Sequence, residues 1–134
     1  MMTNKKTGND FETEFCEILA DNGFWAHNMT QNQAGQPADV IAVRNRAAYL
    51  IDCKVCSSTK GFALTRIEDN QELAMRLWEE KGNGTGWFAI LMNDKIYIAA
   101  LGTLLNARSQ YAALNEPLLS DMCYTLEEWL CQCR

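Results

Sequence analysis

The sequence predicts a single α/β domain, and three observations lead to that prediction. Apolar residues recur at helical spacing in residues 8–23 and 68–82, shorter apolar runs of strand length lie between and after these stretches, and the chain has 134 residues. Alternating helices and strands are typical of an α/β arrangement, and this length suffices for one core. We expect one domain over residues 1–134, with its functional motifs in residues 8–100 and a helical extension over residues 101–134.

The first half of the chain predicts one helix followed by three strands. The helix covers residues 8–23 and ends at Gly23, and its apolar positions are Phe11, Phe15, Ile18 and Leu19. Residues 24–29 form the first predicted strand. Two more strands cover residues 38–43 and 48–55, and a short basic turn joins them. Strands joined by so short a turn are expected to pair antiparallel.

The second predicted helix covers residues 68–82 and ends at Gly82. It is amphipathic, and we expect its apolar side chains Leu73, Leu77 and Trp78 to face the core.

The remaining elements are a hairpin and a short terminal helix. Residues 86–92 and 95–100 are predicted strands around an Asn93–Asp94 turn, which is a typical hairpin sequence. Thr125 and Glu128 have the spacing of a capping box, which predicts the start of the terminal helix.

The composition indicates an intracellular, cytoplasmic protein. No stretch approaches the roughly 18 apolar residues of a membrane span, and no signal sequence follows Lys5 and Lys6. The six cysteines are therefore expected to remain thiols, with Cys53 as a small buried side chain.

The net charge of −5 disfavours tight, nonspecific binding to DNA. The imbalance is local, because residues 1–67 hold seven Lys/Arg and seven Asp/Glu, whereas residues 68–134 hold five and ten. The sequence is thus more compatible with salt-sensitive or structure-selective binding.

Two acids and a lysine occupy strands that are otherwise apolar. Asp52 and Lys54 lie two residues apart in one predicted strand, so their side chains share a face. Antiparallel pairing through the basic turn brings Asp39 near Asp52. Charges in an apolar hairpin are costly unless they are paired or bind a metal ion.

A divalent cation explains this cluster with the fewest assumptions. Mg²⁺ (or Mn²⁺) takes carboxylates together with phosphate oxygens and waters, and a nearby lysine such as Lys54 can orient the attacking water. The cluster therefore predicts hydrolysis of a phosphodiester.

The same residues resemble the PD-(D/E)XK nuclease superfamily. The matching pattern is Pro37-Ala38-Asp39, twelve intervening residues, and Asp52-Cys53-Lys54. Two further stretches resemble motifs of Holliday junction resolvases, namely Gly8 with Glu12, and Phe62-Ala63-Leu64 followed by Ile67 and Gln71. The resemblance spans residues 8–99 and is closest to RecU-like and Hjc-like resolvases, which are often encoded by phages or prophages.

The resemblance implies a restriction-endonuclease-like fold, with a mixed central sheet flanked by helices. It also implies a metal-dependent endonuclease that hydrolyses phosphodiesters in branched DNA during recombination and repair. Asp39, Asp52 and the backbone carbonyl of Cys53 would hold the metal, with Glu12 as a third acid. Lys54 would be the catalytic lysine, and Gln71 would lie close to the active site. Two symmetric nicks in a four-way junction imply a homodimer.

A subgroup of the same superfamily holds an iron–sulfur cluster with one early and several late cysteines, and this chain has a similar set. The alternative of such a cluster therefore stays open, on Cys16, Cys123, Cys131 and Cys133.

Further side chains are predicted to contact the DNA, and these are Lys5, Lys6, Gln33, Gln36, Arg44, Arg46, Lys60 and Arg66. His27 is the only histidine, and we expect it to be structural, with substrate contact as the alternative.

Other functions stay open from the sequence. One is a repair or restriction-type nuclease that acts on flaps or linear duplex. Another is a catalytically silent nuclease-fold module that binds DNA or protein, which the acidic composition favours. The third is an α/β domain in which Asp52 and Lys54 form only a surface ion pair.

Overall fold

The computed structural model describes residues 8–29 and 38–133, and these build a mixed six-stranded sheet with the order β1-β2-β3-β5-β6-β8. β3 and β5 are parallel, whereas the other neighbouring strands are antiparallel. The mixed central sheet of the sequence prediction is thereby confirmed. The strands are β1 (Trp25–Asn28), β2 (Val40–Arg44), β3 (Ala47–Cys56), β5 (Trp87–Met92), β6 (Lys95–Ala100) and β8 (Tyr124–Thr125).

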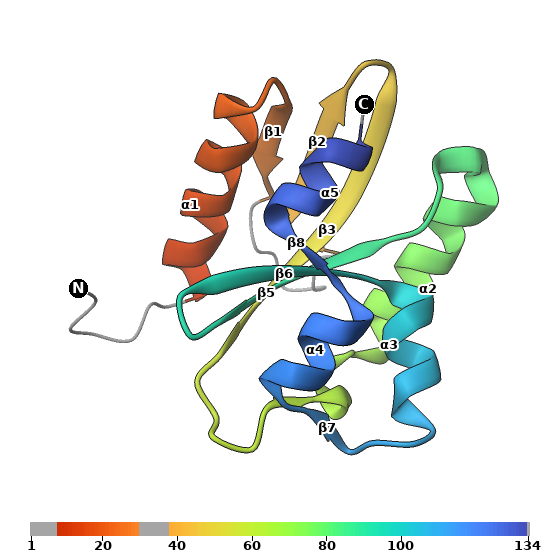
Figure 1. Ribbon diagram of the computed structural model, residues 1–134. Coiled ribbons are helices and arrows are strands. Elements are labelled where there is room, and N and C mark those ends of the chain that lie inside the picture. The colour runs from red at the N-terminus through yellow and green to blue at the C-terminus, as the bar shows by residue number, and fades with distance from the viewer. Residues whose placement is uncertain (1–7, 30–37, 134) are drawn as a thin grey trace.

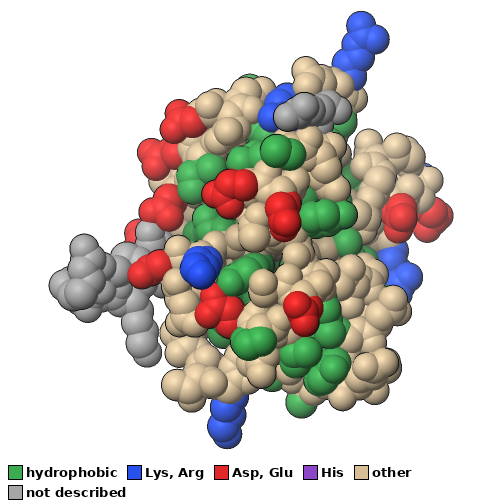
Figure 2. Space-filling view, in the orientation of Figure 1, with side chains coloured by type: hydrophobic (Ala, Val, Ile, Leu, Met, Phe, Trp, Pro, Cys, Tyr) green, Lys and Arg blue, Asp and Glu red, His purple; other side chains and the backbone are tan. Residues whose placement is uncertain are grey.

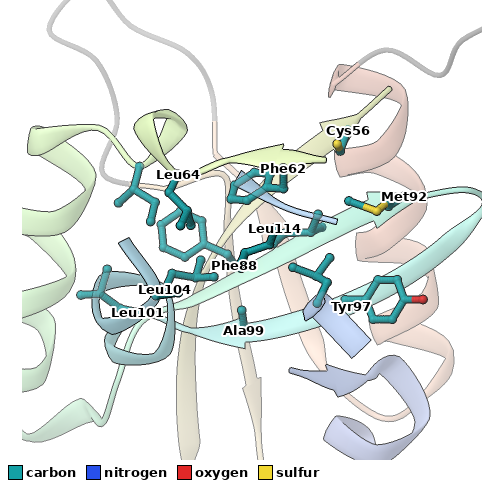
Figure 3. Packing of buried hydrophobic residues seen from close by; sticks show 14 of the residues in the cluster. Cys56, Phe62, Leu64, Phe88, Met92, Tyr97, Ala99, Leu101, Leu104 and Leu114 are labelled. Carbon is teal, nitrogen blue, oxygen red and sulfur yellow. The ribbon is translucent and has the colours of Figure 1, made fainter. Parts of the chain in front are cut away.

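Helices cover both faces of this sheet (Figure 1). Two of them pack on one face, where Phe15, Ile51 and Trp129 are buried together. The other three pack on the opposite face, in the core that Figure 3 shows around Phe88 and Leu104. The first group is α1 (Gly8–Asp21) and α5 (Leu126–Gln132), and the second is α2 (Asp69–Trp78), α3 (Leu101–Arg108) and α4 (Glu116–Met122).

β3 lies inside the sheet and contributes to both cores. Leu50 and Cys56 belong to the core under α2, α3 and α4, whereas Ile51 and Cys53 belong to the core under α1 and α5. Because side chains alternate along a strand, Asp52 shares the face of Leu50. The predicted orientation of Asp52 is therefore correct.

Both predicted hairpins form, and each turns through two residues with positive φ. These are Asn45 and Arg46 between β2 and β3, and Asn93 and Asp94 between β5 and β6. Two consecutive left-handed residues are the hallmark of a turn that matches the strand twist. The register of β2 on β3 is therefore set within the hairpin itself.

The structure contains several short elements that the sequence did not predict. A two-stranded ladder pairs β4 (Phe62–Ala63) with β7 (Ala113–Leu114), and α4 and β8 follow it. Short helical turns, η1 (Leu64–Arg66) and η2 (Glu79–Asn83), flank α2. Strands of two residues are too short to show a periodic pattern in the sequence, so their formation depends on the strand with which they pair.

The predicted core face of α2 is wrong in part. Leu73 and Leu77 are 70% and 52% exposed, while Gln71 and Met75 are buried. The close approach of Met75 to Gly86, where a Cβ would overlap the Met75 side chain, fixes which face of the helix is inward. Trp78 does pack at the edge of this core.

Within residues 8–29 and 38–133, the helices are too short or too polar to cross a lipid bilayer.

Candidate active site

The β2–β3 hairpin brings Asp39 to Asp52. Val40 pairs with Ile51 in the ladder, so Asp39 is placed one step further along, opposite Asp52. The Asp39 backbone N–H donates to the Ile51 carbonyl at 3.2 Å, and Asp39 Oδ2 accepts a hydrogen bond from the Cys53 N–H at 2.9 Å. The juxtaposition predicted from the sequence is confirmed, because the backbone of β3 holds the carboxylate that precedes β2.

Lys54 lies on the same face of β3 as Asp52 and completes a charged group with Asp39 and Asp52. Its Nζ lies 3.1 Å from Asp52 Oδ2. Asp52 is 2% exposed and Lys54 is 8% exposed. The alternative of a surface ion pair is therefore wrong, since both charges are withdrawn from water.

Glu12 approaches this group from α1. It is buried, and its side chain forms hydrogen bonds with those of Asp39 and Asn28. Burial, followed by the negative charge of Asp39, raises the pKa of Glu12 to about 7. Two carboxyl groups in hydrogen-bond contact share a proton or need a cation between them. Glu12 therefore joins the predicted acids through Asp39.

Asn28 is a site residue that the sequence analysis did not identify. It is the last residue of β1, and its hydrogen bond lowers the pKa of Glu12 against the larger effect of burial. A lone asparagine in a strand carries no motif, so only its neighbour in space reveals it.

Burial also raises the pKa of Asp52, to about 8. The Lys54 ammonium lowers this pKa, while the Asp39 carboxylate raises it. Desolvation of the carboxylate outweighs its ion pair, as is common for charges inside a protein. The Asp39–Asp52 pair thus has more negative charge than Lys54 alone stabilises.

The donor set fits a divalent cation. Asp52 Oδ2 is buried and forms an ion pair with Lys54 Nζ, but it has no hydrogen-bond partner. Carboxylate oxygens of this kind are ligands that Mg²⁺ prefers. Across the described ranges, however, no three His, Cys, Asp or Glu side chains converge as a metal site. An ion at Asp39 and Asp52 would therefore take backbone, water or phosphate oxygens as well.

Gln71 has a structural task at the start of α2. Its Oε1 accepts a hydrogen bond from the Glu68 N–H at 3.3 Å, which is one half of a capping box. Its side chain is buried, so the alternative of an exposed first-turn residue is wrong. The proximity of Gln71 to the catalytic group stays a prediction.

Arg44 and Arg66 make contacts within the chain. Arg44 donates to the carbonyls of Asn22, Leu130 and Cys133 and lies over the Phe24 ring. Arg66 donates to the Val55 carbonyl at 2.8 Å. Their guanidinium groups therefore hold structural elements together, and their contacts with DNA stay predictions.

Arg46 and Lys60 are exposed cations, in the β2–β3 turn and in the loop after β3 respectively. Their contacts with DNA stay predictions. Lys5, Lys6, Gln33 and Gln36 lie outside the described residues.

All six cysteines are free thiols, spread over both sides of the sheet. Burial raises the pKa of Cys53 well above its usual value, so this thiol stays neutral beneath the acids. Where the chain is described, no group of three cysteines is placed to hold a cluster. The iron–sulfur alternative is therefore not supported.

The comparisons with known proteins show the family and the fold of this chain. The family model for the archaeal Holliday junction resolvase (Hjc) matches residues 3–123. A crystal structure of Archaeoglobus fulgidus Hjc, a Holliday junction resolvase, matches with a TM-score of 0.67 over 92% of this chain and 97% of that one. Its sequence identity is 15%, so this likeness shows the fold. No curated protein matches the sequence. Because the family model covers nearly the whole chain, the chain belongs to the Hjc family of Holliday junction resolvases, endonucleases that cut branched DNA in recombination and repair.

Proposed function

We propose that this resolvase hydrolyses DNA phosphodiesters with the help of a divalent cation, and that Asp39, Asp52 and Lys54 form its catalytic centre. One observation carries the proposal. A buried carboxylate oxygen of Asp52 without a hydrogen-bond partner lies 3.1 Å from the Lys54 ammonium, beside a second carboxylate. Such an arrangement is costly for folding and is explained by a cation and a phosphate that it accepts.

Asp39 and Asp52, together with the backbone carbonyl of Cys53, would hold Mg²⁺ or Mn²⁺. When bound, the ion supplies positive charge to the scissile phosphate and lowers the pKa of a water. The Cys53 N–H keeps Asp39 in place for this task through its 2.9 Å hydrogen bond.

Lys54 would orient the attacking water and stabilise the negative charge that develops on the phosphate. Its neighbour Asp52 fixes the position of the ammonium. Fixed donors in a dry site stabilise a transition state better than water does.

Glu12 would act through Asp39. Its hydrogen bond to Asp39 and its pKa of about 7 suit a group that releases its proton when a cation reaches the neighbouring carboxylate. Glu12 would thereby adjust the charge of the site to that of the metal and the phosphate.

The DNA would reach this centre along exposed cations. Arg46 and Lys60 are available for phosphate contacts, and Lys5, Lys6, Gln33 and Gln36 remain predicted contacts. The intracellular location also stays a prediction from the sequence.

A homodimer would present two such centres to the two strands that must be cut. The side chains of Leu73 and Leu77 are one helical turn apart and largely exposed on α2. They define an apolar stripe that a second copy of the chain would cover about a two-fold axis.

A cleavage assay tests the proposal. The purified chain is incubated with labelled four-way junction, flap, duplex and single-stranded DNA, with Mg²⁺ or with EDTA. We expect paired nicks in the junction with Mg²⁺ and none in EDTA. Asp52→Asn and Lys54→Ala should each abolish cleavage, whereas Asp121→Asn, an exposed acid on α4, should not.

The net charge of −5 favours one rival, a silent nuclease-fold module. Titration calorimetry with Mn²⁺ separates the two functions. The wild type should bind the ion and Asp52→Asn should not, while a module without catalysis has no need of this binding. Absence of both Mn²⁺ binding and junction cleavage would leave the silent module as the better explanation.

A further inference from the structure

We propose that Trp25 and His27 form a stacking platform for a DNA base at the branch point, an inference that rests on the proposed function. No motif in the sequence marks these two residues as a pair, and the catalytic centre does not use them.

The two side chains stack on one another on β1, and the outer face of the pair is open to a base. Their ring centroids are 5.8 Å apart and their planes differ by 13°, so the rings lie parallel. Trp25 is 63% exposed, and His27 is exposed as well. Both rings are thus accessible from solvent, and the pair rather than a single exposed side chain forms the patch.

The platform lies on the face of the sheet that carries the catalytic lysine. His27 pairs with Ile41, and Ile41 pairs with Leu50, so these side chains share one face. Asp52 and Lys54 follow on the same face of β3 by alternation. With strand rises and spacings of ordinary size, His27 is on the order of 12 Å from Asp52 along this face.

The strands around the platform, β1, β2 and β3, expose no acidic side chain, because their one acid, Asp52, is buried. The acids of α1 and α5 lie over the opposite face of the sheet, whereas the exposed acids of α2 and η2 belong to the helical layer on the platform's own face, and Figure 2 shows acidic side chains over both α1 and α2. The face of the platform carries apolar side chains from β2 and β3, and the exposed Arg46 stands at the turn between these strands. DNA that follows the β2–β3 hairpin from Arg46 would therefore meet the platform along strands without exposed acids.

The platform suits a DNA base better than a protein partner. Bases inside a continuous duplex are stacked on both sides and offer no free face, whereas bases at a branch point lose a neighbour and can stack on an aromatic side chain. The platform consists of two rings at the edge of the sheet, which is small for a protein interface. The larger apolar stripe for a second copy is on α2, with Leu73 and Leu77.

Binding measurements in EDTA test the platform without cleavage. Trp25→Ala is compared with wild type on a four-way junction and on a continuous duplex of the same sequence. The loss of one stacked base should weaken junction binding by about tenfold or more, while duplex binding stays unchanged. Trp25→Phe, which keeps an aromatic face, should retain most of the affinity. The matched control is Tyr124→Ala, because Tyr124 is a 40% exposed aromatic residue on β8, at the other edge of the sheet.

A fluorescent base gives a second readout. With 2-aminopurine at the branch point, wild type should change the fluorescence through stacking, and Trp25→Ala should not. The proposal is overturned if Trp25→Ala binds the junction as wild type does. It is also overturned if junction and duplex affinity fall equally, or if the variant changes from dimer to monomer in size-exclusion chromatography.

The outcomes separate this proposal from the nuclease function. Wild type that binds the junction through Trp25 but never cuts it with Mg²⁺ contradicts the catalytic proposal alone. Wild type that cuts normally, with a Trp25→Ala variant of equal affinity, contradicts the platform alone.

Discussion

The Cys53 N–H donates a 2.9 Å hydrogen bond to Asp39 Oδ2, so one backbone amide of β3 positions an acid that precedes β2. The adjacent residues of β3, Asp52 and Lys54, then complete the charged group. Every residue except proline keeps this backbone donor, so the geometry of Asp39 does not depend on the side chain at position 53.

Substitution of Asp39 should separate its catalytic task from its structural task. Asp39→Asn retains an oxygen that accepts the Cys53 hydrogen bond, so we expect lost cleavage with near-normal stability. Asp39→Ala should lose cleavage as well and also destabilise the protein by about 1–3 kcal/mol, because a buried donor is left unpaired. Urea unfolding and junction cleavage measure the two effects. Equal stability of both variants would contradict the role of this hydrogen bond.

The pH dependence of stability should reveal the buried acids. In the folded protein the pKa of Asp52 is raised from 3.8 to about 8, and that of Glu12 from 4.5 to about 7. Folding therefore favours the protonated carboxyls. Their contribution to stability is fully present below about pH 4 and is lost as the pH rises through these folded pKa values. In EDTA, the free energy of unfolding of wild type minus that of Asp52→Asn should fall between pH 4 and pH 8. The exposed Asp121→Asn variant provides the control, and a flat difference for Asp52→Asn would exclude the raised pKa.

Divalent cations should reverse this loss at pH 8. A ligand that binds only the folded state raises the unfolding temperature, and a cation binds the ionised acids. We expect Mn²⁺ to raise the unfolding temperature of wild type but not of Asp52→Asn. Differential scanning fluorimetry measures both proteins. An equal rise in the unfolding temperature of both proteins would mean that the ion binds at another site.

The apolar stripe on α2 should control the oligomeric state. Leu73→Glu and Leu77→Glu each place a charge in the proposed dimer interface. Each variant should therefore be a monomer in light scattering. Because both side chains are exposed, the fold should persist. The monomer should lose paired cleavage of the junction. The matched control is Glu80→Gln, at an exposed position of η2. Dimers that survive both leucine substitutions would exclude this surface.

Arg44 should matter for stability rather than for DNA binding. Its guanidinium donates to carbonyls of Leu130 and Cys133 and so holds the C-terminal helix against β2. Arg44→Ala should cost about 1.5–3 kcal/mol, the range for hydrogen bonds to charged groups. Arg44→Ala should unfold at a lower temperature and keep its junction affinity. Arg46→Ala should keep its unfolding temperature and bind the junction more weakly. Loss of junction affinity in Arg44→Ala at unchanged stability would restore Arg44 as a DNA contact.

The sequence predicted the charged hairpin because its determinants are local. Alternation along β3 places Asp52 and Lys54 on one face, and the two-residue turn at Asn45 and Arg46 sets the register that brings Asp39 opposite. Both hairpins and the capping box of α5 follow from such short patterns. The roles of Gln71 and Glu12 in catalysis rest on resemblance and remain to be tested.

Only the tertiary structure decided how distant elements meet. The contact of Glu12 with Asp39, the parallel pairing of β3 with β5, and the docking of Arg44 on the C-terminal helix join segments far apart in the chain. The buried face of α2 also depends on Gly86, which the helix pattern does not contain. Periodicity shows that a helix has an apolar side, but the shape of the neighbouring surface selects which residues it buries, since packing depends on both partners.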